Sequence, residues 1–448
     1  MVFKGLKTIN TRNWSRLITT RFYSIKVDGY DNRNISLILN DNQLLQLNNV
    51  FLRDACTSED SVDKYSRQKT FTTSEISSNL LIKNASIIHK DSQDYLQIEW
   101  NSRGKLHTSL YPQSFLYTYS SKLNRMKGKN FDHDKIYWDH DQIMKIEPKL
   151  QVNYHDYLNN QVNFNATLDN LNKYGLAFVN NCPKPSLNEM SESNTSQWPV
   201  AKLAEKFGYI KKTFYGTLFD VKNKKDAINI AYTKAFLPLH MDLLYYESPP
   251  GLQFLHSIKN STLGGENVFA DSFLAAQHVR ETDPNAYYAL TQVPVTFHYN
   301  NNGEHYYYQR PTIVENESYL QSKSYRPEIK EVNYSPPFQG PFEVGVAKCI
   351  NHNHQEIGSG SHQASAGHYL FGDFLRGLSI FEKFINDPNN QYQVKIPEGT
   401  CVIFDNRRVL HSRLEFDDSN GGDRWLMGAY VDGDSFRSKL RVSKREIN

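Results

Sequence analysis

The feature that most constrains this chain is a histidine and an aspartate two positions apart, His240 and Asp242, followed far downstream by His411. Two imidazoles and one carboxylate are the ligand set of a facial non-haem Fe(II) site. Residues i and i+2 of an extended segment point to the same side, so His240 and Asp242 could bind one ion together. We expect His411 to complete the site from a distant strand and to leave the remaining coordination positions of the metal free.

Length and composition indicate a globular protein. The 448 residues suffice for one large domain or two modest ones with a substantial core. The chain is 13% aromatic, and its small net charge of +3 does not indicate a nucleic-acid surface. No segment approaches the roughly 20 apolar residues that cross a bilayer, so we expect no membrane span. A disulfide scaffold is not expected, and a reducing compartment fits better, because the four cysteines are scattered without a C-x-x-C pair: Cys56, Cys182, Cys349 and Cys401.

Residues 1–27 differ in composition from the rest of the chain. They contain six basic residues and no acidic residue before Asp28, with serine, threonine and apolar residues between them. This composition is typical of a mitochondrial presequence, with a plausible processing site between Arg21 and Ser24. A disordered basic arm is the alternative. We expect a protein of the mitochondrial matrix.

The remainder divides into two parts. Residues 34–118 carry short alternating runs separated by polar turns, such as Ile35–Leu39 and Tyr95–Trp100, and predict a small β-rich module. Residues 150–444 alternate helical patterns with strands. We expect helices at 164–175, 199–207 and 366–386, a buried strand at 401–405, and a surface insertion in the polar, histidine-dotted stretch 350–366.

The segments around the three metal-ligand candidates are more specific than the candidates alone. They read LPLHMDLLYY at 237–246, GTCVIFDNRRVLH at 399–411 and RWLMGAY at 424–430. With their neighbours from about residue 45 to 444, they resemble the Fe(II)/2-oxoglutarate dioxygenases of the taurine dioxygenase superfamily. Within it they are most similar to the γ-butyrobetaine and trimethyllysine dioxygenases of carnitine biosynthesis. The resemblance implies a mixed β fold with helices, in which a double-stranded β-helix (jelly-roll) core follows the small N-terminal module.

The resemblance also implies that His240, Asp242 and His411 bind iron. Two neutral imidazoles and one carboxylate leave a ferrous site with a net charge near +1, which can accept dianionic 2-oxoglutarate and O2. A fourth candidate ligand, His256, lies in an apolar run, and we interpret it as a core histidine.

Arginine is suited to the distal carboxylate of 2-oxoglutarate, because its planar guanidinium binds a carboxylate through two hydrogen bonds. Arg424, thirteen residues after His411, stands where the family has that arginine. Asn229 matches a family asparagine close to the cosubstrate. Three other arginines near His411 could compete for the role of Arg424: Arg407, Arg408 and Arg413.

The resemblance further implies an aromatic cage. A quaternary ammonium group cannot donate a hydrogen bond, and proteins surround it with the faces of aromatic rings. The family's cage positions are Tyr215, Phe219, Tyr232 and Tyr430 in this sequence, and γ-butyrobetaine dioxygenases tend to have tryptophan at position 219. A group of core aromatics is the alternative interpretation.

The N-terminal module departs from the family's zinc-binding pattern of three cysteines and a histidine. Cys56 is retained, but Ser58 and Ser61 occupy the next two positions, and His107 could match the histidine. One thiolate and one imidazole cannot form a closed tetrahedral site, so we predict no structural zinc.

These observations together predict a mitochondrial enzyme that hydroxylates a trimethylammonium substrate with Fe(II), 2-oxoglutarate and O2. γ-Butyrobetaine, which would give carnitine, is the first choice of substrate. Trimethyllysine hydroxylation, a divergent member without catalysis and a zinc hydrolase that uses the same three ligands are the alternatives. The family suggests a homodimer, and ascorbate is expected to support activity.

Overall fold

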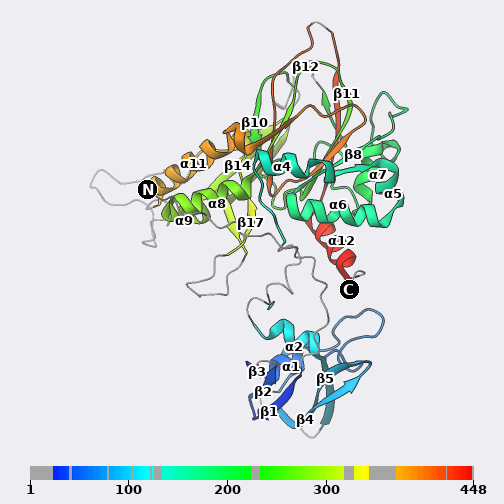
Figure 1. Cartoon of the computed structure of the whole chain (residues 1–448), viewed down its shortest axis with the longest axis vertical. Coiled ribbons are helices and arrows are strands. Elements are labelled where there is room, and N and C mark those ends of the chain that lie inside the picture. Colours follow the sequence, from blue (N-terminus) through cyan, green and yellow to red (C-terminus); the bar gives the residue numbers. More distant parts are fainter. Residues whose placement is uncertain are drawn as a thin grey trace, which may run out of the picture. The chain divides into compact units, whose positions relative to one another are not determined.

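The computed structural model divides the chain into two compact units, residues 1–130 and 131–448 (Figure 1). Residues 1–23 of the predicted presequence and the whole predicted insertion 350–366 lie outside the residues that the structure describes. The described residues are 24–39, 43–77, 80–102, 105–121, 124–125, 134–222, 233–316, 327–342, 370–419 and 421–445.

The first unit consists of two antiparallel three-stranded sheets. One has the order β1 (Lys26–Tyr30), β2 (Asn34–Leu39), β3 (Gln43–Asn48); the other has β4 (Leu81–Lys90), β5 (Gln93–Ser102), β6 (Lys105–Pro112). Helices α1 (Asn49–Asp54) and α2 (Gln113–Tyr119) and the 3₁₀ turn η2 (Thr73–Glu75) complete the unit. Alternate residues of β2 and β5 are buried in one apolar core, so the β-rich prediction for these runs is confirmed.

The second unit contains two larger sheets. The six-stranded sheet has the order β7 (Gln151–Asn153), β8 (Leu176–Asn180), β19 (Cys401–Asp405), β11 (Leu252–Asn260), β22 (Arg424–Val431), β9 (Phe219–Lys222). The four-stranded sheet has the order β10 (Leu237–His240), β20 (Val409–Arg413), β13 (Asn267–Asp271), β18 (Gln391–Val394). All neighbouring strands are antiparallel except β7 and β8.

The two sheets share one apolar core. Phe269 of β13 meets Phe404 of β19 edge to face, with ring centroids 5.6 Å apart, and Phe178 of β8 meets Tyr392 of β18 in the same way at 6.1 Å. Edge-to-face pairs at these separations are favourable aromatic contacts. The inner faces of the two sheets therefore pack against each other, and side chains from both can line a common cavity.

The described part of the second unit also contains three two-stranded sheets. They pair β12 (Leu263–Gly264) with β21 (Phe416–Asp417), β14 (Pro294–Asn301) with β15 (Glu304–Pro311), and β16 (Ile313–Glu315) with β17 (Ile329–Val332). Short 3₁₀ turns are η3 (Glu147–Lys149), η4 (Thr195–Gln197), η6 (Pro336–Phe338) and η8 (Pro388–Asn390).

Helices cover the second unit. Helices α8 (Ser272–Thr282), α9 (Pro284–Gln292) and α11 (Phe371–Ile385) pack against one another (Figure 1). The others are α4 (His140–Ile146), α5 (Tyr154–Asn159), α6 (Gln161–Tyr174), α7 (Pro199–Glu205) and α12 (Gly433–Arg445). The expected helices at 164–175 and 199–207 and the strand at 401–405 are confirmed, as is the described part of the expected helix 366–386. Among the described residues, no helix has the length and apolarity to span a membrane.

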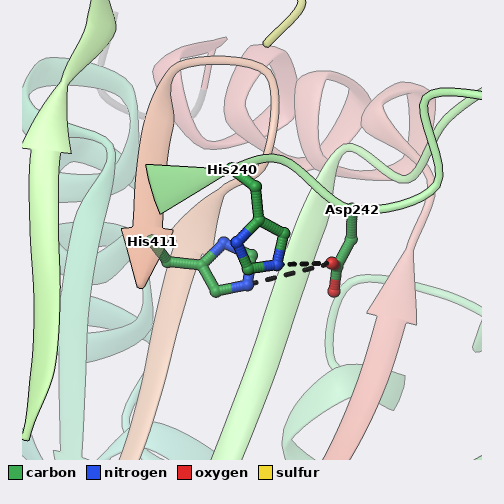
Figure 2. A group of neighbouring side chains, drawn as sticks. All are labelled: His240, Asp242 and His411. Atoms are coloured by element: carbon green, nitrogen blue, oxygen red, sulfur yellow. Dashed lines mark ion pairs between the residues drawn. The ribbon is translucent and has the colours of Figure 1, made fainter. Parts of the chain in front are cut away.

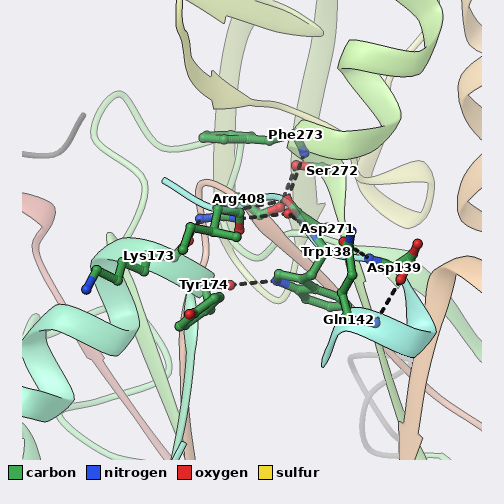
Figure 3. Close-up of polar contacts among 10 residues, drawn as sticks. Trp138, Asp139, Gln142, Lys173, Tyr174, Asp271, Ser272, Phe273 and Arg408 are labelled. Atoms are coloured by element: carbon green, nitrogen blue, oxygen red, sulfur yellow. Dashed lines mark hydrogen bonds and ion pairs between the residues drawn. The ribbon is translucent and has the colours of Figure 1, made fainter. Parts of the chain in front are cut away.

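A buried ion pair joins the start of β20 to the end of β13 (Figure 3). Arg408 contacts Asp271 through two hydrogen bonds, of 2.7 and 3.1 Å, and neither side chain is exposed. Arg408 also donates to the carbonyls of Lys173 and Ile136, and the Trp138 amide donates to Asp271. A buried pair is tolerated when its remaining hydrogen-bonding groups are satisfied, as they are here. The pair therefore fixes the strand that carries His411.

Candidate metal centre and its cavity

The structure brings the three predicted metal ligands together. His240, the last residue of β10, lies directly opposite His411 in the antiparallel pairing of β10 with β20. The Nε2 atoms of His240 and His411 lie 3.2 and 3.9 Å from Oδ1 of Asp242 (Figure 2). Among the described residues, these three form the one group of histidine, cysteine and acidic side chains close enough to share a metal ion. A distant strand does supply the second histidine.

The position of Asp242 differs from the prediction. Strand β10 ends at His240, and Asp242 lies in the following turn, where Leu243 has a φ of +59° (Figure 2). The expectation that both ligands project from one extended strand is therefore wrong. The turn brings the carboxylate back toward the two imidazoles, which alternation along a strand would not have done.

Asn406 holds this turn and was missed by the sequence analysis. Its amide group donates to the carbonyls of Asp242 and Pro250, at 3.0 and 3.1 Å, and its Oδ1 accepts from the Asp242 amide at 2.9 Å. The side chain is fully buried, and buried amides need such partners. Its position directly after the predicted strand 401–405 was the available signal, since a polar residue there enters the interior.

The charge states of the centre favour a cation. Burial alone would raise the pKa of Asp242, but the hydrogen bond from His240 and the neighbouring His411 hold it well below its usual range. Burial lowers the pKa of His411 to about 3, so this imidazole is neutral near pH 7. In the tautomer that carries its proton on Nδ1, His240 donates to the Pro238 carbonyl at 2.8 Å, and Nε2 then presents a lone pair to the carboxylate in place of that hydrogen bond. A cation between these atoms would remove their repulsion.

The centre opens into a cavity of about 70 Å³, which is room for several water molecules. Polar and cationic side chains line one part of it: Gln253, Asn267, Ser412, Arg413 and Arg424. Aromatic side chains line another: Tyr215, Phe219, Tyr245, Phe338 and Tyr430.

Arg424 begins β22 and points into this cavity, as the strand-like sequence after it predicted. The side chain is buried, and its Nε has no hydrogen-bond partner among the described residues. Burial, and secondarily the charge of Arg413, lower the pKa of Arg424 to about 9. A buried cation is costly when it has no counter-charge, and Arg424 has none among the described residues, so the cavity is suited to an anion at this point.

Two of the three competing arginines are excluded by their partners. Arg407 pairs with Glu331 at 3.0 Å and donates to Asn333, and Arg408 pairs with Asp271. Arg413 lines the cavity beside Arg424, and one of its amino groups donates to the Ala235 carbonyl at 2.5 Å. The cavity therefore presents two cations, and Arg413 remains a second candidate for binding an anion.

Three of the four predicted cage residues lie in the cavity. The rings of Phe219 and Tyr430 are stacked, with centroids 4.7 Å apart and planes inclined by 21°. The ring centroids of Tyr215 and Phe219 are 6.5 Å apart, and the Tyr215 hydroxyl is 3.5 Å from that of Tyr245. Tyr232, like Asn229, lies outside the described residues.

His256 is a core residue, as predicted. It is buried in β11, and neither ring nitrogen has a hydrogen-bond partner among the described residues. Burial lowers the pKa of His256 to about 4, so the ring is neutral at physiological pH.

The four positions compared with a zinc site converge in the first unit. The sulfur of Cys56 lies 3.3 Å from both His107 Nε2 and the Ser58 hydroxyl, and Ser58 contacts Ser61 at 3.2 Å. Serine hydroxyls occupy the two positions where the family resemblance implies thiolates. That this group holds no structural zinc stays a prediction.

Comparison with known proteins identifies relatives along most of the chain. The family described as "Taurine catabolism dioxygenase TauD, TfdA family" matches residues 140–430. Dioxygenase str8 of Strobilurus tenacellus is 34% identical over 399 residues, which cover 88% of this chain and 84% of that protein. Gamma-butyrobetaine dioxygenase of a Pseudomonas species is 26% identical, with 92% and 94% covered. The mitochondrial trimethyllysine dioxygenase of Bos taurus is 25% identical, with 90% and 83% covered.

Proposed function

The chain is a dioxygenase of the TauD, TfdA family, and we propose that it hydroxylates a small trimethylammonium compound. The family implies Fe(II), 2-oxoglutarate, O2 and a small-molecule substrate. The observation that carries the proposal is the convergence of His240, Asp242 and His411 in one cavity with the buried cation Arg424. This combination provides a metal site and an anion site in the same enclosed space.

In the proposed site, His240, Asp242 and His411 hold Fe(II). When bound, the iron and 2-oxoglutarate supply the activation of O2. Arg424 binds the distal carboxylate through its guanidinium, and Arg413 adds positive charge beside it. We assign Asn229 to the neighbourhood of the cosubstrate on the resemblance alone.

Tyr215, Phe219, Tyr232 and Tyr430 are proposed to surround the trimethylammonium group. The stacking of Phe219 on Tyr430 covers one face of each ring, so the cation would meet their outer faces and the ring of Tyr215. γ-Butyrobetaine, giving carnitine, is our first choice of substrate. Trimethyllysine is the alternative, because relatives named for each reaction match most of the chain.

Several further assignments accompany this proposal. The antiparallel sheets with their shared core support a jelly-roll core, and we assign the catalytic domain to 150–444 and the β-rich module to 34–118. The basic composition of 1–27, together with the mitochondrial relative, supports a presequence and a matrix location. Ascorbate as a supporting reductant and a homodimer are proposed from the family resemblance.

The test uses purified protein with Fe(II), ascorbate and 2-oxoglutarate, and measures succinate and hydroxylated product with γ-butyrobetaine and trimethyllysine side by side. Product from γ-butyrobetaine supports the first choice, and product from trimethyllysine alone selects the alternative. Absence of substrate-dependent succinate with both would rule out the trimethylammonium proposal. H240A serves as the control, since it removes a metal ligand and is expected to abolish turnover.

A further inference from the structure

The two carboxylate oxygens of Asp242 have different partners. Oδ1 faces the imidazoles, 3.2 Å from His240 Nε2 and 3.9 Å from His411 Nε2. Oδ2 accepts a hydrogen bond of 2.6 Å from the hydroxyl of Tyr430. A carboxylate can bind a metal through one oxygen or through both, and here the second oxygen is already engaged by a neutral donor.

Tyr430 cannot easily turn its hydroxyl away. It lies on β22, paired with Gln253 of β11, and is 3% exposed. The ring of Phe219 is stacked against it. Phe219 reaches that position because Gly428 has no side chain: a Cβ there would lie 2.1 Å from the Phe219 ring. The strand, the stacked ring and the glycine together fix the direction of the hydroxyl.

The backbone of Asp242 has a separate anchor. Asn406 bonds both its amide and its carbonyl, so the main chain of the turn is held from one side and the carboxylate from the other.

We propose that Tyr430 is a positioning residue of the metal centre, whose hydroxyl holds Asp242 as a ligand through Oδ1 alone. The inference rests on the proposed function of the three ligands. It gives Tyr430 a task distinct from that of a cage wall, because the task needs the hydroxyl, whereas a cage needs only the ring. Groups that hydrogen-bond to metal ligands typically contribute about 10- to 100-fold to metal affinity or activity.

The test separates hydroxyl from ring with the variant Tyr430→Phe in the full-length protein. Titration calorimetry with Fe(II) under anaerobic conditions, and with Co(II), should show metal binding weakened about 10- to 100-fold. The visible spectrum of the Co(II) protein should change as well, because the carboxylate is free to rotate. Tyr245→Phe is the matched control. It removes another buried hydroxyl of the same cavity, one that lies 3.5 Å from the Tyr215 hydroxyl, and should retain the wild-type affinity and spectrum.

Metal affinity within twofold of wild type and an unchanged Co(II) spectrum for Y430F would overturn the inference. Equal losses in Y430F and Y245F would also overturn it, since the effect would then not be specific to the bond with Asp242. Failure of the proposed metal site looks different: wild type would bind no metal, or H240A would bind it equally well. If Y430F does not fold, Phe219→Leu tests the same point by removing the stacked ring, and unchanged metal affinity in that variant contradicts the proposal.

Discussion

Replacing Arg424 by methionine should weaken cosubstrate binding while making the metal-free protein more stable. The two effects have opposite signs because the buried charge of Arg424 destabilises the protein without an anion and binds the anion when one is present. Truncating one partner of a buried charged hydrogen-bonded pair costs about 2–5 kcal/mol, or about 30-fold to several thousand-fold in Kd. Since Arg413 remains in the cavity, we expect the lower part of this range, about 30- to 300-fold.

The gain in stability follows from the pKa of Arg424, which falls from 12.5 to about 9 in the folded protein. Between these two pH values the unfolded chain binds more protons than the folded one, so stability rises with pH across this window. Below pH 9 the charge opposes folding at its full extent. Methionine removes that cost, and we expect a stabilisation of about 1 kcal/mol or more at pH 7.

Calorimetric titration of the Co(II) protein with 2-oxoglutarate measures the first effect, and urea unfolding of the metal-free protein at pH 7 and pH 10 measures the second. Arg407→Met is the matched control. It breaks the pair with Glu331, so it should lower stability and leave 2-oxoglutarate affinity unchanged. Affinity of R424M within threefold of wild type would refute the assignment, and loss of affinity in R413M instead would transfer the role to Arg413. A fall in the stability of R424M would refute the view that its charge is uncompensated.

Three further outcomes are expected. Asp271→Asn should lower the free energy of unfolding by about 3–5 kcal/mol in urea titrations, because it leaves the charge of Arg408 buried without its partner; a loss below 1 kcal/mol would contradict this. Asn406→Ala should weaken Fe(II) binding about 10-fold or more by releasing the turn of Asp242, and unaltered binding would show that the turn is held by other contacts. The pKa of His256 is about 4 in the folded protein, against an ordinary value of 6.5 that applies to the unfolded chain. Its contribution to stability is therefore lost as the pH falls from 6.5 to about 4. Between pH 7 and pH 5 wild type should therefore lose roughly 2 kcal/mol more than His256→Leu, and parallel pH profiles would argue against a buried neutral ring.

The metal-ligand candidates could be named from the sequence because their chemistry is restrictive. Few combinations other than two histidines and an acidic residue fit a facial site, and His411 was expected to come from a distant strand. Arg424 was named from the family resemblance, and the apolar strand after it favoured an inward-facing side chain. The interior position of His256 followed from its apolar neighbours in the same way.

The partners of these residues could not be read in this manner. Asn406 lies 164 positions from Asp242, and Tyr430 lies 188 positions from it, so their hydrogen bonds depend on how distant strands are aligned. A local pattern predicts which side of a strand is buried, but it does not predict which atom of a distant segment will be the hydrogen-bond partner. For the same reason the sequence left Arg407 and Arg408 as candidates for binding the cosubstrate, and only the structure shows that each is paired with a carboxylate.

The sequence alone determined which side chains are available for the proposed chemistry: His240, Asp242 and His411 as metal ligands, and an arginine for an anion. The tertiary structure decided the geometry. It placed Asp242 in a turn instead of on the strand, engaged its second oxygen with Tyr430, and stacked Phe219 where Gly428 leaves room. Residue identity limits what a side chain can bind, whereas direction and partners follow from packing among segments that meet only in the folded chain.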